Sequence, residues 1–206
     1  MPDGYFDLAD AYAVETPDDN RDLYARWAAT YESAFIADNG YVYHLGVVGS
    51  FVDTASDEDD PVLDVGCGTG LVGVALRATG PWTVDGLDLS TEMLGEARVK
   101  VAGEGDSVYR HLHEGDLTAT LNIPSGTYGA VVSCGTFTHG HVGPTAFDEL
   151  YRITRPGGLF AIGINPDHFT NLGFADRLVD DVAAGRITEP VIRRVNTYGA
   201  GYPAGQ

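Results

Sequence analysis

The feature that most constrains the fold of this chain is the run VLDVGCGTG, residues Val62 to Gly70. Residues Val62 to Val65 form a short apolar strand, and glycine then occupies every second position. Glycine adopts positive φ and lets a ligand approach the backbone closely, because it has no Cβ. An apolar helix from Leu71 to Ala78 follows directly, so its free N–H groups would face that ligand. The run predicts a strand, a ligand-binding loop and a helix.

Other interpretations of this loop are open on its own residues. Gly68 to Gly73 also match G-x-G-x-x-G, the dinucleotide-binding fingerprint, which is a weak signal by itself. A tight strand-to-helix turn without a ligand is a further interpretation. The carboxylate of Asp64 adds a constraint, because a charge in a buried strand is costly without a cationic or donor partner. Residues further along the chain are needed to choose between these interpretations of the loop.

The strand, the glycine loop and the acidic residue together resemble motif I of the class I S-adenosylmethionine (SAM)-dependent methyltransferases. The resemblance implies SAM as cofactor and S-adenosylhomocysteine (SAH) as product. It implies cofactor contacts for five residues: Asp64, Gly66, Cys67, Gly68 and Gly70.

The end of the next strand carries a candidate ribose ligand. Asp88 lies 18 residues after Gly70, and a carboxylate there can bind a ribose diol in dinucleotide and SAM sites alike. Strand alternation predicts that Asp85 faces solvent instead. The segment Gly86 to Leu94 is similar to the G-x-D-x-S-x-x-M-L segment of many SAM methyltransferases, which disfavours the dinucleotide alternative. By that resemblance the cofactor contacts include Asp88, Leu89 and Met93, while Ser90 caps the helix.

Two later segments agree with this family. Asp116 and Leu117 follow a third strand, where the family places an acidic residue and a backbone N–H at the adenine; a plain polar turn is the alternative. Arg155 to Gly158 resemble the family's turn before the fifth strand. The fourth strand ends at Ser133, which we also expect at the cofactor.

The N-terminal 55 residues are expected to be helical. Leu23, Trp27, Tyr31 and Phe35 recur every four residues and form an apolar stripe, and a second helix is expected from Tyr41 to Val52 with Leu45, Val48 and Val52 inward. The stripe either packs on the core or, with Tyr31, roofs the SAM pocket. We expect an extension or cap over residues 1–55 and a SAM-binding methyltransferase domain over residues 56–206.

Strands that alternate with helices over residues 61–164 predict an α/β fold, a Rossmann-like, mainly parallel sheet flanked by helices. A class I sheet normally ends in a two-strand hairpin. Here one candidate strand follows, Val191 to Tyr198, so the C-terminal hairpin is expected to be incomplete: either the chain is truncated or this strand takes an edge position.

Charge and cysteine content indicate which substrates and which cellular compartment to expect. The chain has 12 basic and 30 acidic residues, a formal net charge of −18, which argues against nucleic-acid substrates. Cys67 and Cys134 form no C-x-x-C pair, so neither a metal site nor a disulfide is expected. We expect a cytoplasmic protein without membrane contact.

The acceptor side carries two candidate bases, His139 and His141, in the loop after the fourth strand. Their unperturbed pKa near 6.5 suits proton abstraction from a hydroxyl, although ordinary loop histidines are equally expected. The loop resembles that of the Williams–Beuren-region-type methyltransferases. We expect a metal-independent methyltransferase that acts on O, N or S of a small molecule. The alternatives are an NAD-type oxidoreductase and a SAM-binding protein without catalytic activity.

Overall fold

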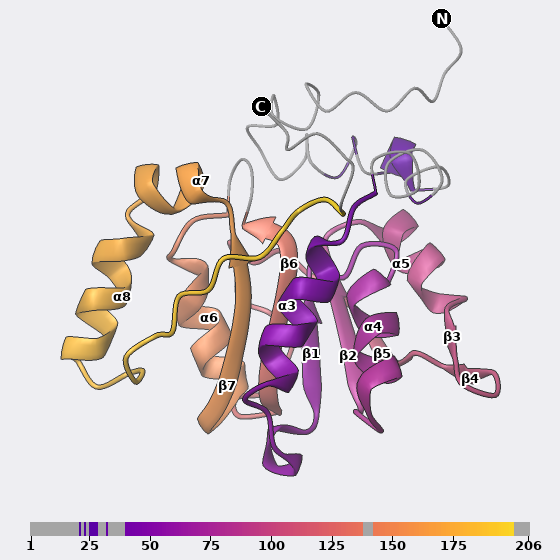
Figure 1. Ribbon diagram of the computed structural model, residues 1–206, viewed down its shortest axis with the longest axis horizontal. Coiled ribbons are helices and arrows are strands. Elements are labelled where there is room, and N and C mark those ends of the chain that lie inside the picture. The colour runs from indigo at the N-terminus through magenta and orange to yellow at the C-terminus, as the bar shows by residue number, and fades with distance from the viewer. Residues whose placement is uncertain are drawn as a thin grey trace, which may run out of the picture.

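A parallel sheet of five strands, in the order β5-β2-β1-β6-β7, forms the centre of the molecule (Figure 1). The computed structural model describes residues 40–137 and 142–199, together with residues 21, 23, 25–28 and 32. The helices are α3 (Tyr43–Val52), the 3-10 helix η2 (Asp57–Asp59), α4 (Leu71–Thr79), α5 (Thr91–Arg98), α6 (Ala146–Ile153), α7 (Pro166–Asn171) and α8 (Phe174–Ala183). The strands are β1 (Val62–Val65), β2 (Val84–Asp88), β3 (Val101–Ala102), β4 (Asp106–Ser107), β5 (Tyr109–Glu114), β6 (Tyr128–Phe137) and β7 (Thr154–Ile164).

This topology confirms the expected Rossmann-like sheet. Parallel neighbours need long crossovers, which here contain α4, α5 and α6. The chain adds β2 and β5 on one side of β1 and then returns to add β6 and β7 on the other. The strand order therefore reverses at β1 and β6, and ligands of open α/β sheets bind beyond the carboxyl ends of the strands at such a switch point.

Helices cover both faces of the sheet. On one face α3, α4 and α5 pack over a cluster that includes Phe51, Leu76 and Val132. On the other face α6 and α8 pack over a cluster that includes Leu150, Phe174 and Val131. Both sides of the inner strands are thus buried, as is usual for parallel sheets.

The helix predicted for residues 41–52 is present, but its inward face was predicted wrongly. α3 buries Val47, Val48 and Phe51, whereas Leu45 is 54% exposed and Val52 39% exposed. The helix packs against α4, β6 and β7, and these neighbours meet the Val47–Phe51 side, so only Val48 of the three expected residues faces inward.

β6 and β7 are longer than their patterns predicted. Residues 134–137, expected in a loop, continue β6 and end in the fully buried Phe137. The Arg155–Gly158 segment, expected as a turn before the fifth strand, lies inside β7 as an irregularity: the pairing steps from Tyr128↔Thr154 to Ala130↔Leu159. Gly157 has φ of 85° at this point, a conformation that favours glycine.

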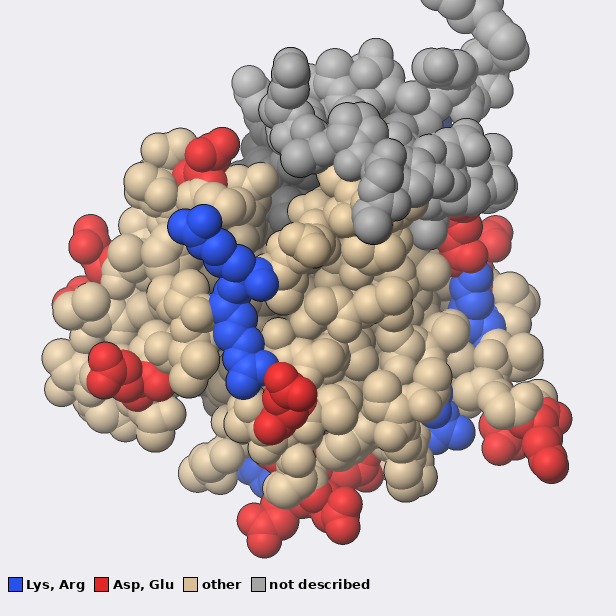
Figure 2. All heavy atoms as spheres, viewed as in Figure 1, with Lys and Arg blue, Asp and Glu red and all other residues tan. Residues whose placement is uncertain are grey.

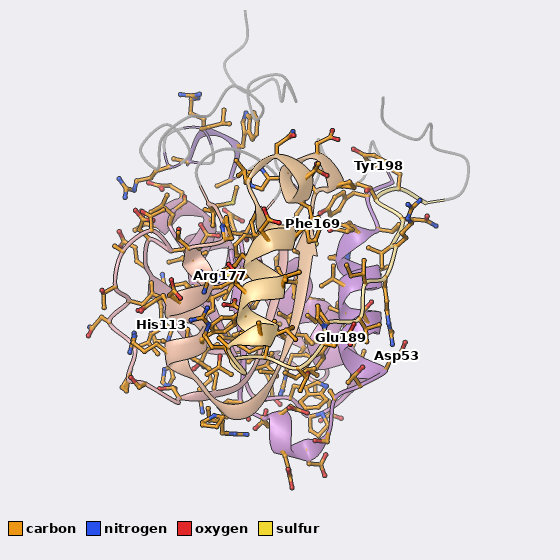
Figure 3. The ribbon with its side chains drawn as sticks, turned by 90° about the vertical axis from the view of Figure 1, so that its left-hand side faces the viewer. Asp53, His113, Phe169, Arg177, Glu189 and Tyr198 are labelled. Carbon is orange, nitrogen blue, oxygen red and sulfur yellow. The ribbon has the colours of Figure 1, made fainter. Side chains whose placement is uncertain are left out.

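The strand predicted over Val191–Tyr198 is not formed. Val191 and Ile192 are 80% and 73% exposed, and the backbone pairs with residues 40–42 instead, through Val42 N to Thr197 O at 2.9 Å and Gly199 N to Gly40 O at 2.8 Å. Arg193 forms an ion pair with Asp53 at 2.6 Å. These contacts draw the segment along α3, from Glu189 past Asp53 to Tyr198 (Figure 3), and away from the sheet.

Candidate functional site

The glycine loop connects β1 to α4 at the carboxyl end of the sheet. Its first residues are fixed to β2, because the N–H groups of Gly66 and Cys67 both donate to Leu87 O, at 2.7 and 3.0 Å. Gly70 ends the loop as the N-cap of α4, with φ of 101°. The backbone N–H groups in the first turn of α4 therefore point into the loop, as anion- and ligand-binding helix termini do.

Gly66 and Gly68 differ in what surrounds them. At Gly66 a Cβ would lie 1.8 Å from Thr136 Oγ1, so the fold itself forbids it. At Gly68, with φ of 53°, a Cβ would meet no described atom within 4 Å. The fold alone therefore excludes a side chain at Gly66, whereas Gly68 borders open space.

Asp88 lies at the end of β2 beside this loop. Its Oδ2 accepts a hydrogen bond from Gly68 N at 2.8 Å, and its Oδ1 accepts one from Ser90 N at 2.9 Å. Burial raises the pKa of this carboxyl above its ordinary value, although these backbone donors counter the rise. A carboxylate has about four acceptor positions, so both oxygens can still receive ribose hydroxyls.

Asp64 lies in β1, fully buried beneath the glycine loop. Its Oδ2 accepts a hydrogen bond from Tyr109 Oη at 2.7 Å. Its Oδ1 is buried and finds no hydrogen-bond partner in the part of the chain that the structure describes. Burial raises the pKa of Asp64 to about 7, with Asp88 adding to the rise and the Tyr109 hydroxyl opposing it.

The expectation that Asp85 faces solvent is wrong. Asp85 is 1% exposed and lies on the opposite face of β2 from Asp88. It accepts hydrogen bonds from Arg110 Nε and Nη2 at 2.9 and 2.7 Å, from Tyr128 Oη at 2.9 Å and from His111 N at 3.0 Å. Asp85 is therefore a structural anchor for β5 and β6.

The start of α5 is as predicted. Ser90 caps the helix, and its hydroxyl oxygen accepts from Met93 N at 3.2 Å. Met93 is 1% exposed, whereas Leu89 is partly exposed beside Asp88. Met93 is therefore an interior residue of α5, and Leu89 stays partly accessible at the end of β2.

Asp116 and Leu117 follow β5 next to Asp88. Gly115 N donates to Asp88 O at 3.0 Å and so fixes this turn at the end of β2. Asp116 Oδ1 accepts from Thr118 N at 2.8 Å and from Thr118 Oγ1 at 2.7 Å, an Asx turn. Leu117 is buried in the core. Asp116 thus forms the polar turn.

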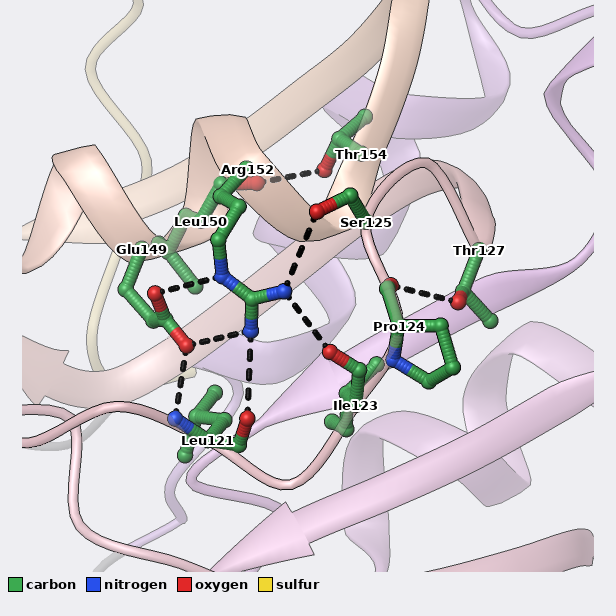
Figure 4. A network of polar contacts seen from close by, with 9 residues as sticks. All are labelled: Leu121, Ile123, Pro124, Ser125, Thr127, Glu149, Leu150, Arg152 and Thr154. Atoms are coloured by element: carbon green, nitrogen blue, oxygen red, sulfur yellow. Dashed lines mark hydrogen bonds and ion pairs between the residues drawn. The ribbon is translucent and has the colours of Figure 1, made fainter.

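Arg152 of α6 holds the rest of the connection between β5 and β6 (Figure 4). Its guanidinium donates to Leu121 O at 3.1 Å and Ile123 O at 2.8 Å, and it pairs with Glu149 at 2.5 Å. Glu149 in turn accepts from Leu121 N at 2.6 Å. The turn that carries Asp116 is therefore fixed at both ends.

Ser133 and Thr136 hold the glycine loop from the side of β6. Ser133 Oγ and Thr136 Oγ1 both donate to Val65 O, the last carbonyl of β1, at 2.8 and 3.0 Å. Ser133 is fully buried, so it positions the loop. Cys67 is also buried, and burial raises the pKa of its thiol. Both cysteines are free thiols.

Tyr31, His139 and His141 lie outside the described residues, as do the neighbours that connect His139 and His141. The described residues on either side of that segment are held by α7 and the residue before it. Asn165 N donates to Phe137 O at 3.1 Å, and His168 Nε2 donates to Val142 O at 3.1 Å. The part of the stripe that is described, Leu23 and Trp27, is buried.

Sequence reasoning missed Tyr109 and Thr136. Tyr109 is the first residue of β5 and reaches Asp64 on β1, which is 45 positions earlier in the chain. Neither contact has a local sequence pattern, because each depends on which strands become neighbours in the sheet.

Comparison with known proteins identifies the fold's family. Residues 62–158 match a family described as a methyltransferase domain. Human methyltransferase-like protein 27 is 38% identical over 102 residues, which cover 49% of this chain and 39% of that protein. The malonyl-(acyl-carrier protein) O-methyltransferase of Pectobacterium atrosepticum is 39% identical over 113 residues, covering 52% of this chain and 39% of that protein.

A solved structure agrees with these relatives. It is a methyltransferase in complex with the Haloferax volcanii Trm112 methyltransferase activator, with a TM-score of 0.57 and 26% identity over 70% of this chain and 59% of that chain. This chain carries a class I SAM-dependent methyltransferase domain. The chain spans about two fifths of the length of the two curated relatives.

The described residues of this methyltransferase domain fit SAM, the cofactor of the family. Gly68 leaves open space beside its backbone, and Asp64 offers a buried oxygen that no described group satisfies. Asp88 lies beside Gly68, with both oxygens oriented by backbone donors. An acidic site suits a cofactor that carries sulfonium and ammonium charges, which the dinucleotide alternative lacks.

Proposed function

We propose that this chain transfers a methyl group from SAM to O, N or S of a small-molecule acceptor, without a metal ion. The observation that carries the proposal is the placement of two carboxylates, Asp64 and Asp88, at the glycine loop of the switch point. In this proposal Asp88 binds the ribose, Asp116, Leu89 and Met93 border the adenine, and Asp64 faces the amino group of the cofactor.

Bound SAM supplies a methyl group already activated on a sulfonium. The chain then has to align the acceptor within about 3–3.5 Å and exclude water. A base is needed only for a protonated acceptor such as a hydroxyl, and we propose His139 or His141 for that role. The N-terminal residues 1–55 complete the site as a cap in this proposal, and residues 56–206 form the SAM-binding domain.

We infer the class of methyl acceptor from the net charge of the chain. With a net charge of −18, the chain repels polyanions, which argues against nucleic acids. On the face that Figure 2 shows, basic side chains gather over the C-terminal segment, where Arg193 is paired with Asp53.

No helix among the described residues is long and apolar enough to cross a membrane. The cytoplasmic location stays a prediction.

A protein partner is compatible with this proposal, because the solved neighbour is bound to a Trm112 activator. Copurified or added activator of that type can be tested by its effect on SAH affinity and turnover. A turnover assay is the measurement that distinguishes an active enzyme from a SAM-binding protein without activity.

Calorimetry with SAH, SAM and NAD tests the cofactor. We expect SAH and SAM to bind and NAD not to. Asp88→Ala should weaken SAH by about 2–4 kcal/mol, or roughly 30- to 1000-fold, because charge-assisted hydrogen bonds contribute about 1.5–3 kcal/mol each. Glu114→Gln is the matched control, since Glu114 pairs with Asp88 across β2 and β5 but is exposed. Unchanged SAH affinity in Asp88→Ala would contradict the assignment.

A further inference from the structure

The side chain of Tyr109 crosses the sheet beneath the glycine loop. It starts on β5, passes over β2 and reaches Asp64 on β1, where its hydroxyl donates to Oδ2 at 2.7 Å. Gly86 of β2 lies in register with Asp64, and a Cβ at Gly86 would lie 3.1 Å from Tyr109 Cε1. The missing side chain at Gly86 therefore gives the ring its path across β2.

The start of α4 packs on the same ring. A Cβ at Gly73 would lie 2.4 Å from Tyr109 Cζ and Oη, and a Cβ at Gly70 would lie 3.1 Å from Tyr109 Cε2. Tyr109 itself is 5% exposed. The ring thus fills the space that three glycines leave between β2, the loop and α4, and its hydroxyl has one described acceptor side chain, Asp64.

The groups that face Asp64 come from three other strands, one helix and the glycine loop. Asp88 of β2, Cys67 of the loop and Cys134 of β6 each interact unfavourably with its charge. Tyr109 of β5 donates a hydrogen bond that favours the charged form, and the backbone N–H of Gly73 in α4 favours it as well. Tyr109 is therefore the side chain among them that stabilises an Asp64 carboxylate.

We propose that Tyr109 is a positioning residue of the cofactor site: it holds Asp64 through Oδ2 and leaves Oδ1 to receive the cationic amino group of the cofactor. This inference rests on the proposed function. It assigns to Tyr109 one effect that can be measured, the pH range over which the carboxylate is charged.

A second tyrosine–aspartate pair provides the control. Tyr128 is fully buried and donates to Asp85 Oδ2 at 2.9 Å, on the face of the sheet opposite to Asp64. Tyr128→Phe removes the same hydroxyl from a similar environment. It should lower stability and leave the pH dependence of cofactor binding unchanged.

The experiment measures SAH affinity by calorimetry from pH 6 to pH 8.5 for the parent, Tyr109→Phe and Tyr128→Phe. The parent should bind at pH 8.5 and lose affinity as the pH falls through about 7, where Asp64 becomes protonated. Without its donor, Asp64 should protonate about one pH unit higher, so Tyr109→Phe should bind about tenfold more weakly at pH 6 and nearly normally at pH 8.5.

Three results would overturn the proposal. They are an unshifted profile for Tyr109→Phe, an equal loss of affinity at every pH, and the same shift in Tyr128→Phe. Should Tyr109→Phe fail to fold, Gly73→Ala takes its place, because its Cβ displaces the Tyr109 hydroxyl while alanine favours the helix; an unshifted profile there also overturns the proposal. A parent that does not bind SAH at pH 8.5 instead refutes the proposed function itself.

Discussion

Replacement of Asp85 by asparagine should destabilise the fold without weakening SAH binding. The carboxylate accepts four hydrogen bonds, from Arg110, Tyr128 and the backbone of His111. An asparagine keeps one acceptor oxygen and turns an amide group toward the remaining donors. Asp85 and Asp88 point to opposite faces of β2, so the cofactor site should not feel the change.

The size of the destabilisation depends on how well the hydrogen-bond partners of Asp85 are solvated once its carboxylate is removed. Removing one member of a buried ion pair typically costs about 3–5 kcal/mol, because the other charge stays buried. Here the Arg110 side chain is 42% exposed, so water can solvate it. Tyr128 Oη also keeps His113 Nε2 at 3.2 Å. We therefore expect about 2–3 kcal/mol, or a decrease in melting temperature of about 4–12 °C for a domain of this size.

The pH dependence gives the sharper test. Burial opposes ionisation of Asp85, but the hydrogen bonds from Arg110 and Tyr128 outweigh it and lower the pKa. The folded pKa thus lies below the unfolded value of about 3.9. The stabilisation is fully present above that unfolded value and is lost as the pH falls through the folded pKa.

Thermal unfolding followed by circular dichroism at pH 7, 5 and 3 measures this directly. The difference between parent and Asp85→Asn should be full at pH 7 and pH 5 and should shrink at pH 3. Asp106→Asn, in the exposed hairpin, should change stability by less than about 0.5 kcal/mol. A difference between parent and Asp85→Asn that is the same at pH 3 and pH 7, or none at pH 7, would refute the reasoning.

Three further predictions concern other parts of the chain. Gly66→Ala should destabilise the fold by about 2–4 kcal/mol through backbone strain and its clash with Thr136, whereas Gly68→Ala should destabilise it by about 1–2 kcal/mol but reduce SAH affinity at least tenfold. Thermal melts and calorimetry that rank the two variants alike would contradict this. Asp181→Asn should lower the free energy of unfolding by about 2–4 kcal/mol and increase amide exchange in α8, because Asp181 is fully buried and pairs with Tyr151, Arg177 and Arg186. The neighbouring Asp180→Asn should leave both unchanged. Amide exchange with and without SAH should show added protection in residues 20–40 if the N-terminal extension is a cap, and none there if it only packs.

Local rules predicted the backbone structure around the glycine loop well. The glycine loop, Asp88 and the Ser90 cap all lie within short segments whose residue types determine the backbone. Tyr109 and Thr136 could not be found in this way, because their contacts join strands that are distant in sequence. Asp85 was predicted wrongly for a different reason. Strand alternation places it opposite Asp88, but on that opposite face Arg110 and Tyr128 cover it and hydrogen-bond to it.

The C-terminal region shows the limit of pattern reading. Val191–Tyr198 has the β-branched residues of a strand, yet its pairing with residues 40–42 and Asp53 decides its path. α8 was not predicted, although Phe174 is fully buried and Arg177, which Figure 3 labels, connects the helix to Asp148 of α6 at 2.6 Å. Such ion pairs become visible only when the helices are already side by side.

The anchoring of Phe137 and Val142 makes the segment between them exchangeable. Four residues, Thr138 to His141, join two positions whose carbonyls are held by Asn165 and His168. Because the ends are fixed by a later part of the chain, doubling the length of the segment should cost only about 0.6 kcal/mol in closure entropy. This segment, which carries the two bases proposed above, can therefore be diversified by loop exchange, in a library or in evolution, while Asp64, Asp88 and the glycine loop stay unchanged.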